Sequence, residues 1–464
     1  MGATTNSASG ETGYFPALPS PSSDDFVSEQ RGDRRITTRG AIALGVGSMV
    51  GAGIFALMGV AAAKAGSAVW LSFLVAGIIA LLTGHSFVQL GIRYPTRGGV
   101  VEYLVRAYGS GRFSGGCSIL FYIAQLIGMA MISLAFGRFA AKLVGLGEAD
   151  LLFWEKVLAS GLIVGLAALN LVGSKLVSTA QRVVVLVNLA LLVAFTLGLS
   201  AHADASRLSV GTWPEATPML GSLALTFFAF VGFAVVSNAA EDMDDPSRDL
   251  PRAMYASLAI VLVLYVALAM AVVATVEGQE LTSSGATLLA VAARENFGEI
   301  GFHVLLVSAI LSTVTSLNGG LFGVTSITYT LAEKGQLPSR FGREIGVSTR
   351  GLTISAVLAL LMVNFMTLTT VASLGAATSL LVYSLVNYGA WRLLADAGWH
   401  RPVILLSIIA CILAIVVWIL YTLQTSPGSF SIFLSFLVVA FVSEGLLQRY
   451  HGRRILEREH WESS

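Results

Sequence analysis

Apolar stretches recur along the chain from Gly40 onward, each near the 20 residues with which an α-helix spans a hydrocarbon core of about 30 Å. Charged residues make up 12% of the chain and hydrophobic residues 55%, so the charges are too few to cover a water-facing surface. The sequence therefore predicts an all-α polytopic protein embedded in a lipid bilayer. Twelve transmembrane helices are expected, at residues 40–65, 68–92, 113–141, 151–172, 182–200, 217–240, 252–276, 300–330, 352–371, 373–394, 402–422 and 430–448. The division near Ser373, between the ninth and tenth of these helices, is marked by fewer polar residues than any other.

The charges predict how the chain is oriented. With the N-terminus inside, 22 of the 28 Lys and Arg residues fall on inner segments and 6 on outer ones, which favours both termini in the cytoplasm of a multi-pass plasma-membrane protein. Residues 1–38 are polar and lack an apolar signal core, so we expect a disordered cytoplasmic tail, with a second tail at 449–464. The net charge of +1 leaves no basic excess for a nucleic-acid partner.

The two cysteines, Cys117 and Cys411, both lie in apolar runs. They have neither a disulfide framework nor the spacing of a metal-binding motif. We expect no metal and no cofactor.

The first span contains four glycines in nine residues, in the run Gly45-Val-Gly47-Ser-Met-Val-Gly51-Ala-Gly53. Glycine weakens a helix where lipid offers no water to freed backbone groups. One interpretation is an unwound segment that lines a cavity and presents backbone N–H groups to an anion. The other is a close helix contact through Gly47 and Gly51, and spacing alone favours this second interpretation.

The sixth span carries one glycine among aromatics, in the run Phe227-Phe-Ala-Phe-Val-Gly-Phe233. On its own this run is typical of packing. Its position changes the interpretation, because spans one and six begin two successive sets of five, where an inverted repeat would place a pair of broken helices. The acidic run that follows, from Glu241 to Asp249, predicts a solvated loop whose Pro251 starts the next helix.

Several motifs resemble signatures of the amino acid–polyamine–organocation (APC) transporter superfamily. They are Gly47-Ser-Met-Val-Gly-Ala-Gly-Ile-Phe55, Tyr94-Pro-Thr-Arg-Gly-Gly99, Pro246-Ser-Arg-Asp-Leu-Pro-Arg-Ala253, Ser316-Leu-Asn-Gly-Gly-Leu-Phe322 and Ala332-Glu-Lys-Gly-Gln-Leu-Pro338. The resemblance runs from about Arg39 to Gln448. It implies a five-plus-five inverted repeat at 39–200 and 213–394, two extra transmembrane helices at 402–448, and alternating access around an amino-acid site at the membrane midplane.

The resemblance also implies binding residues. Backbone N–H groups in the first break would hold the substrate carboxylate, and carbonyls in the sixth span would take its α-ammonium, without burying a charged side chain. Phe228 or Phe230 would close over the substrate. The matching positions here are Ser48, Met49, Gly51, Ala52, Gly53 and Ile54 in the first span and Phe228, Ala229, Phe230, Val231 and Gly232 in the sixth.

Two positions depart from the family pattern. Proton-coupled relatives often carry a lysine in span five, where this chain has Asn188, and often an arginine in span eight, where it has Ser326. Asn188 cannot titrate, so proton coupling through a lysine is not expected. Further candidates for substrate or ion contact are Gln125, Asn188, Asn238, Ser312 and Thr313. His85 is expected to make an interhelical hydrogen bond rather than to carry protons, and Glu102 to be an interfacial charge.

These observations predict a secondary active transporter that moves an amino acid or a related amine, as a symporter or an antiporter, with Na⁺ or H⁺ as the coupling ion where one is used. Neutral substrates are favoured, because neither break carries an acidic residue to pair with a cationic side chain. Three alternatives stay open: an amino-acid exchanger, a transporter of polyamines or cationic amino acids, and a sensor that binds without transport. An intramembrane enzyme is not supported, because the acids lie almost entirely at loops or span ends.

Overall fold

A computed structural model describes residues 36–96, 98–172, 177–333, 344–345, 348–396 and 398–451. The tail predicted at 1–38 lies outside these residues up to position 35, as does most of the tail predicted at 449–464.

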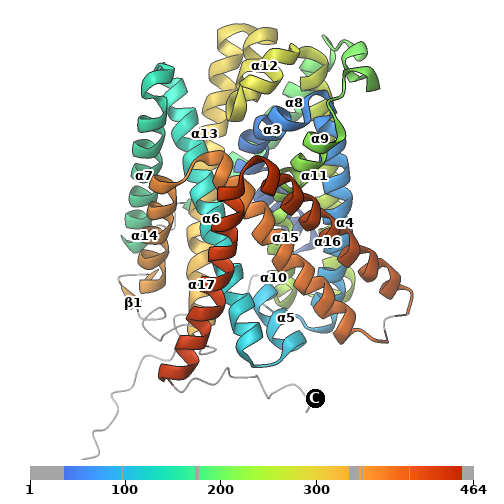
Figure 1. The fold of residues 1–464 in the computed structure, drawn as a ribbon, viewed down its shortest axis with the longest axis vertical. Coiled ribbons are helices and arrows are strands. Elements are labelled where there is room, and N and C mark those ends of the chain that lie inside the picture. The colour runs from blue at the N-terminus through green and yellow to red at the C-terminus, as the bar shows by residue number, and fades with distance from the viewer. Residues whose placement is uncertain are drawn as a thin grey trace, which may run out of the picture.

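The described chain is built almost entirely of helices (Figure 1). The first half contains α2 (Thr38–Val50), α3 (Ala52–Ala65), α4 (Val69–Arg93), α5 (Gly99–Tyr108), α6 (Arg112–Leu143), α7 (Glu148–Val172) and α8 (Val177–Ser200). The second half contains α9 (Ala216–Phe228), α10 (Ala234–Asn238), α11 (Pro246–Thr275), α12 (Gly278–Ser283), α13 (Leu288–Glu333), α14 (Arg350–Phe365), α15 (Leu368–Leu393), α16 (His400–Thr425) and α17 (Pro427–His451).

Short elements join these helices. One-turn 3₁₀ segments lie at η1 (Gly66–Ala68), η2 (Ala205–Leu208), η3 (Val210–Thr212), η4 (Val231–Phe233), η5 (Ala240–Asp242) and η6 (Gly285–Thr287). Two strands of two residues each, β1 (Glu344–Ile345) and β2 (Ser348–Thr349), pair antiparallel, with Glu344 opposite Thr349.

The predicted all-α polytopic fold is confirmed. Within the described residues, ten helical stretches are long and apolar enough to cross a membrane. One of them, Gly53–Arg93, joins α3 and α4 and has 41 residues, while α14 with 16 residues falls below that length. The count of twelve transmembrane helices therefore remains a prediction.

The predicted division near Ser373 was wrong. The chain leaves α14 at Phe365 and enters α15 at Leu368, where the Thr367 side chain caps the new helix by accepting a hydrogen bond from the Thr370 N–H at 3.3 Å. Ser373 lies inside α15, buried, and accepts a hydrogen bond from Trp418 Nε1 of α16 at 2.9 Å. A threonine N-cap, two residues after the end of one helix, can thus start the next helix with almost no polar residue between the two.

The helix after the acidic run also begins earlier than predicted. Asp245 is the N-cap of α11 and Pro246 is its first residue, so Pro251 lies inside the helix. The hydroxyl and the N–H of Ser247 both donate to Asp245 Oδ1, and these hydrogen bonds lower the pKa of Asp245. Proline fits the first helical turn, where its missing N–H would have had no partner.

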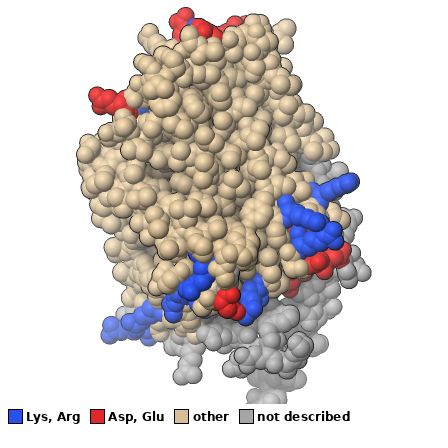
Figure 2. Space-filling view, turned by 90° about the vertical axis from the view of Figure 1, so that its right-hand side faces the viewer, with Lys and Arg blue, Asp and Glu red and all other residues tan. Residues whose placement is uncertain are grey.

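The bundle is organised around two long central helices. α6 packs against α7, α13, α15 and α17, and α11 packs against α2, α4 and α8. α7 and α14 stand together at one side of the bundle, and α12 lies at the opposite end from α5 and β1 (Figure 1). The charge pattern of the sequence predicts α12 on the outer side of the membrane and both α5 and β1 on the inner side, so these elements also lie at opposite ends in that prediction. A space-filling view shows a broad band without charged side chains and Lys and Arg gathered toward one end (Figure 2).

Candidate functional site: two facing helix interruptions

The first predicted span is interrupted at one residue. α2 ends at Val50, α3 begins at Ala52, and Gly51 between them has the non-helical angles φ −51° and ψ −127°. A side chain at Gly51 would collide with the hydroxyl of Ser316 in α13, which explains why the interruption falls on a glycine. Gly51 is the N-cap of α3 and has no side chain with which to accept from the first N–H groups of that helix.

The sixth predicted span is interrupted over several residues. α9 ends at Phe228, a turn follows at Ala229 and Phe230, and η4 leads into the short helix α10. Within this stretch the N–H of Phe230 donates to the carbonyl of Phe227, and that of Phe233 to the carbonyl of Phe230, three residues back in each case. These are 3₁₀ hydrogen bonds, and they turn the carbonyl groups away from the direction that they would have in a continuous α-helix.

The two interruptions are in direct contact. The Ser48 hydroxyl donates to the carbonyl of Gly232 at 2.8 Å. A Cβ atom on Gly232 would lie 2.5 Å from the Ser48 carbonyl oxygen, and one on Gly53 would lie 3.3 Å from the carbonyl oxygen of Ala229. The N-terminus of α3 and the carbonyl of Ala229 are therefore neighbours. Ser48 remains exposed, and Gly53, Val231 and Gly232 are half-buried.

Two buried tyrosines hold the interrupted backbone, and sequence reasoning missed both. Tyr265 of α11 donates to the carbonyl of Met49 at 2.7 Å, and Tyr383 of α15 donates to the carbonyl of Val231 at 2.9 Å. Each hydroxyl satisfies a carbonyl at the edge of an interruption, where the helical partner is lost. The signal in the sequence was a lone tyrosine within an apolar span, which also fits simple packing.

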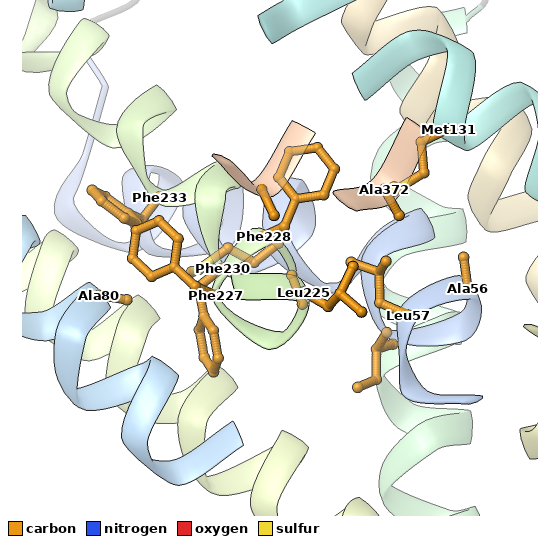
Figure 3. Packing of buried hydrophobic residues seen from close by; sticks show 14 of the residues in the cluster. Ala56, Leu57, Ala80, Met131, Leu225, Phe227, Phe228, Phe230, Phe233 and Ala372 are labelled. Carbon is orange, nitrogen blue, oxygen red and sulfur yellow. The ribbon is translucent and has the colours of Figure 1, made fainter. Parts of the chain in front are cut away.

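The two candidate aromatics, Phe228 and Phe230, point in different directions. Phe230 is fully buried against Tyr265, with ring centroids 5.1 Å apart. Phe228 is directed away from Phe227, Phe230 and Phe233 (Figure 3). Its ring lies beside Gly375 of α15, where a Cβ atom would come within 2.5 Å of Phe228 Cζ. Of the two, only Phe228 keeps some exposed surface.

The other candidate residues lie on α6, α10 and α13. Asn238 is exposed at the end of α10, with its side chain against Gly99 of α5, and Gln125 is half-buried on α6. Ser312 and Thr313 are buried on α13, where the Thr313 hydroxyl donates to the Ile310 carbonyl of its own helix at 2.8 Å. Met49 and Ile54 are buried beside Gly51, and the side chain of Ala52 lies outside the described part.

Asn188 takes part in an interhelical hydrogen bond. Its Oδ1 accepts from the Ser308 hydroxyl at 2.6 Å, which joins α8 to α13. A similar bond runs from Asn170 Nδ2 of α7 to Asn318 Oδ1 of α13 at 2.8 Å. Asn188 therefore occupies its span as a neutral link between helices.

His85 also joins helices. Its Nδ1 lies 2.7 Å from the Tyr255 hydroxyl of α11, and its Nε2 lies 3.2 Å from Nδ1 of His400 in α16. These contacts have the form of the interhelical hydrogen bond predicted for His85.

The buried carboxylates of the described residues lie on helices that carry neither interruption. They are Glu102 on α5, Glu155 on α7 and Glu444 on α17. Glu102 pairs with Arg106 at 2.8 Å, Glu155 pairs with Arg138 at 2.8 Å, and Glu444 accepts from Gln448 at 2.8 Å. Within the described part of the chain, no group of three His, Cys, Asp or Glu side chains is placed to hold a metal ion. The interrupted segments thus offer backbone donors and acceptors in a setting without charged side chains.

The chain belongs to the amino acid permease family, whose sequence profile matches residues 36–442. This match confirms the resemblance to the APC superfamily, and it places the chain in a class of multi-pass membrane proteins that transport amino acids.

Relatives with known names agree with this class. The chain is 30% identical over 401 residues to the inner membrane transport protein YbaT of Escherichia coli (strain K12), covering 86% of this chain and 92% of that protein. It is 27% identical over 312 residues to the serine/threonine exchanger SteT of Bacillus subtilis (strain 168), covering 64% of this chain and 68% of that protein. It is 30% identical over 369 residues to the chloroplastic cationic amino acid transporter 9 of Arabidopsis thaliana, covering 70% of this chain and 60% of that protein.

Proposed function

We propose that this protein is a secondary transporter that binds an amino-acid zwitterion between the interruptions at Gly51 and at 229–233 and moves it by alternating access. The observation that carries the proposal is the contact between them, in which Gly53 faces the carbonyl of Ala229 and Ser48 bonds to Gly232. A zwitterion needs donors for its carboxylate and acceptors for its ammonium within a few ångströms of each other, and this contact offers both.

Each end of the substrate would meet backbone. The first N–H groups of α3, from Ala52 to Ile54, form an uncapped helix N-terminus, which favours a carboxylate. The carbonyls of Phe228, Ala229 and Val231 would accept from the ammonium, with Phe228 as the aromatic beside it. Val231 already accepts one hydrogen bond from Tyr383, and a carbonyl oxygen has a second lone pair.

We propose a neutral amino acid as the substrate. A cationic side chain in a site of low polarity would require a carboxylate partner, and the buried carboxylates of the described residues lie on α5, α7 and α17. The named relatives include both a serine/threonine exchanger and a cationic amino acid transporter, so relatedness alone does not decide the class.

A thermal-shift screen of the purified protein against the twenty amino acids and putrescine tests the substrate class. A ligand that binds only the folded state raises the melting temperature, by a stabilisation of about 2.7 kcal/mol at 100 times its Kd. We expect stabilisation by one or more small neutral amino acids. Stabilisation by arginine, lysine or putrescine alone would refute the neutral class and leave the transporter class standing.

For coupling, we propose exchange, facilitated movement or sodium coupling ahead of proton symport. Asn188 presents a neutral amide that bonds to Ser308, so it has no charge to gain or lose with pH. The measurement is uptake into proteoliposomes under a pH gradient, under a sodium gradient, and with internal amino acid but no ion gradient. Uphill accumulation driven by the pH gradient alone, and abolished by a protonophore, would contradict this proposal. Binding without any uptake would instead identify a sensor.

A further inference from the structure

An apolar hollow lies between α15 and α16, and each of these helices carries an arginine close to the turn that connects them. The hollow has a volume of about 400 Å³ and is lined by Leu381, Ser384, Leu385, Tyr388, Ile408, Ile412, Ile415 and Val416. Two lining residues carry a hydroxyl, Ser384 and Tyr388, and that of Ser384 donates to the Leu380 carbonyl of its own helix. Ile412 is 47% exposed and Val416 43% exposed, so the hollow opens on the outside of the bundle.

The arginines lie on the same helix faces as this hollow. Arg392 follows Tyr388 by four residues on α15, and Arg401 precedes Ile408 by seven on α16, spacings that keep side chains on one face of a helix. Basic side chains gather toward one end of the molecule on the face shown in Figure 2. On each of the two helices, α15 and α16, an arginine thus lies between the residues that line the apolar hollow and the turn that connects the helices.

A stack of aromatic rings holds the two guanidinium groups. The Tyr108 and Tyr388 rings are 6.4 Å apart, and the Tyr388 and Trp391 rings are 6.1 Å apart, both nearly parallel. Arg392 lies over Tyr108 at 5.8 Å, and Arg401 lies over Trp391 at 5.0 Å. Stacking on a ring face fixes an arginine while leaving its N–H groups free to bind a planar or tetrahedral oxyanion.

Nothing within the described chain neutralises these charges. No ion pair or side-chain hydrogen bond between described residues uses either guanidinium, and Arg401 Nε is buried without a hydrogen-bond partner. The nearby Asp396 is exposed in the turn after α15 and pairs with neither arginine. Arg401 also stands in the first turn of α16, whose N-cap has no side-chain bond and whose first turn has no acid. A cation at a helix N-terminus is unfavourable unless an anion accompanies it.

We propose that this site binds an anionic phospholipid, with one acyl chain in the hollow between α15 and α16 and the phosphate between Arg392 and Arg401. We infer a phospholipid because three features follow one another along these helices: an apolar surface open to the bilayer, an aromatic stack, and two arginines without an acidic partner. Basic pockets between transmembrane helices recognise anionic headgroups in this way. The site is separate from the interruptions at Gly51 and at 229–233, so it stands whether or not the proposed substrate is right.

Native mass spectrometry of the full-length protein in detergent tests the proposal. Equal amounts of dioleoylphosphatidylglycerol and dioleoylphosphatidylcholine are added to wild type, to Arg392→Gln/Arg401→Gln and to Arg252→Gln. Arg252 is the matched control, because it is exposed near the start of α11 and does not line the hollow. We expect phosphatidylglycerol to be preferred by about thirtyfold in wild type and in the control, and the preference to vanish in the double variant, since each arginine near an anionic headgroup contributes about fivefold.

A second variant tests the acyl-chain part without touching the charges. Ile412→Trp fills the hollow and should displace the bound lipid while both arginines remain. Equal binding of the two lipids by wild type, or unchanged binding in both the double and the Ile412→Trp variants, would overturn the proposal. So would a dimer of this chain that Ile412→Trp dissociates whatever lipid is present, since a second copy would then occupy the hollow. The melting temperature of each variant shows that it is folded.

Discussion

Gly232 is the residue at which the two interruptions approach most closely. A methyl group there would lie 2.5 Å from the Ser48 carbonyl oxygen, which is backbone and cannot rotate away. We expect Gly232→Ala to separate the interruptions, to destabilise the fold by about 1–3 kcal/mol as overpacking does, and to reduce amino-acid uptake strongly. Thermal unfolding and proteoliposome uptake are the measurements.

Gly323→Ala is the matched control for Gly232→Ala. Gly323 lies in α13 with nothing within 4 Å of an added methyl, so uptake should stay at the wild-type level and stability should rise by up to about 1 kcal/mol. Wild-type uptake by Gly232→Ala would show that the contact between the interruptions has no part in transport.

Tyr383 gives a second prediction at the residue scale. Tyr383→Phe keeps the ring and removes the hydroxyl that donates to the Val231 carbonyl at 2.9 Å. Because a buried acceptor left unsatisfied costs about 1–3 kcal/mol, we expect a lower melting temperature and weaker substrate binding in the thermal-shift assay. Tyr329→Phe, on a residue 38% exposed, is the control and should change neither value. Equal effects of the two substitutions would count against the role of the Tyr383 hydroxyl.

Single residues were read from the sequence with unequal success. The glycines of the first span do mark an interruption, because a lost helical bond in an apolar span needs a residue that tolerates it, and Gly51 is that residue. Tyr265 and Tyr383 could not be found this way. Their hydroxyls matter only because the fold places each one beside a carbonyl more than 150 residues away in the chain.

At the scale of helices, α8 and α13 are joined by the hydrogen bond between Asn188 and Ser308 at 2.6 Å. A double-mutant cycle with Asn188→Ala and Ser308→Ala should give a coupling energy of about 0.6–1.7 kcal/mol, the range for such bonds within membranes. Unfolding in a mild denaturing detergent measures it. Thr325→Ala, whose hydroxyl bonds only within its own helix to Leu321, replaces Ser308→Ala in the control cycle and should give no coupling with Asn188→Ala. A coupling near zero for Asn188 and Ser308 would argue against the link.

Helix boundaries show what sequence patterns convey and what they omit. The long apolar stretches predicted most helices, since lipid leaves the backbone few other ways to satisfy its polar groups. The boundary at Thr367 was missed because one threonine caps α15, and the start of α11 was missed because Pro246 rather than Pro251 occupies its first turn. Caps are local bonds, and several residues in each region could have made them.

The whole molecule should be oriented with its basic end in the cytoplasm. Impermeant thiol labelling of intact cells tests this, because the native Cys117 and Cys411 are buried and give little background. Exposed positions at the two ends are Glu280 on α12 and Arg248 on α11. We expect Glu280→Cys to be labelled and Arg248→Cys to be labelled only after the membrane is made permeable, since basic loops stay on the cytoplasmic side. The reverse pattern would refute the orientation.

The sequence by itself determined the class of fold, and for the first and sixth spans it left a choice between an interruption and a close helix contact, which the structure decided. Hydrophobic length, charge asymmetry and glycine placement are local properties of the chain, and the bilayer turns them directly into structure. Only the tertiary structure decided that Ser48 meets Gly232, that two tyrosines hold the interrupted backbone, and that α15 and α16 together line one apolar hollow. Such contacts join residues far apart in the chain, and they depend on how whole helices pack, which no local pattern records.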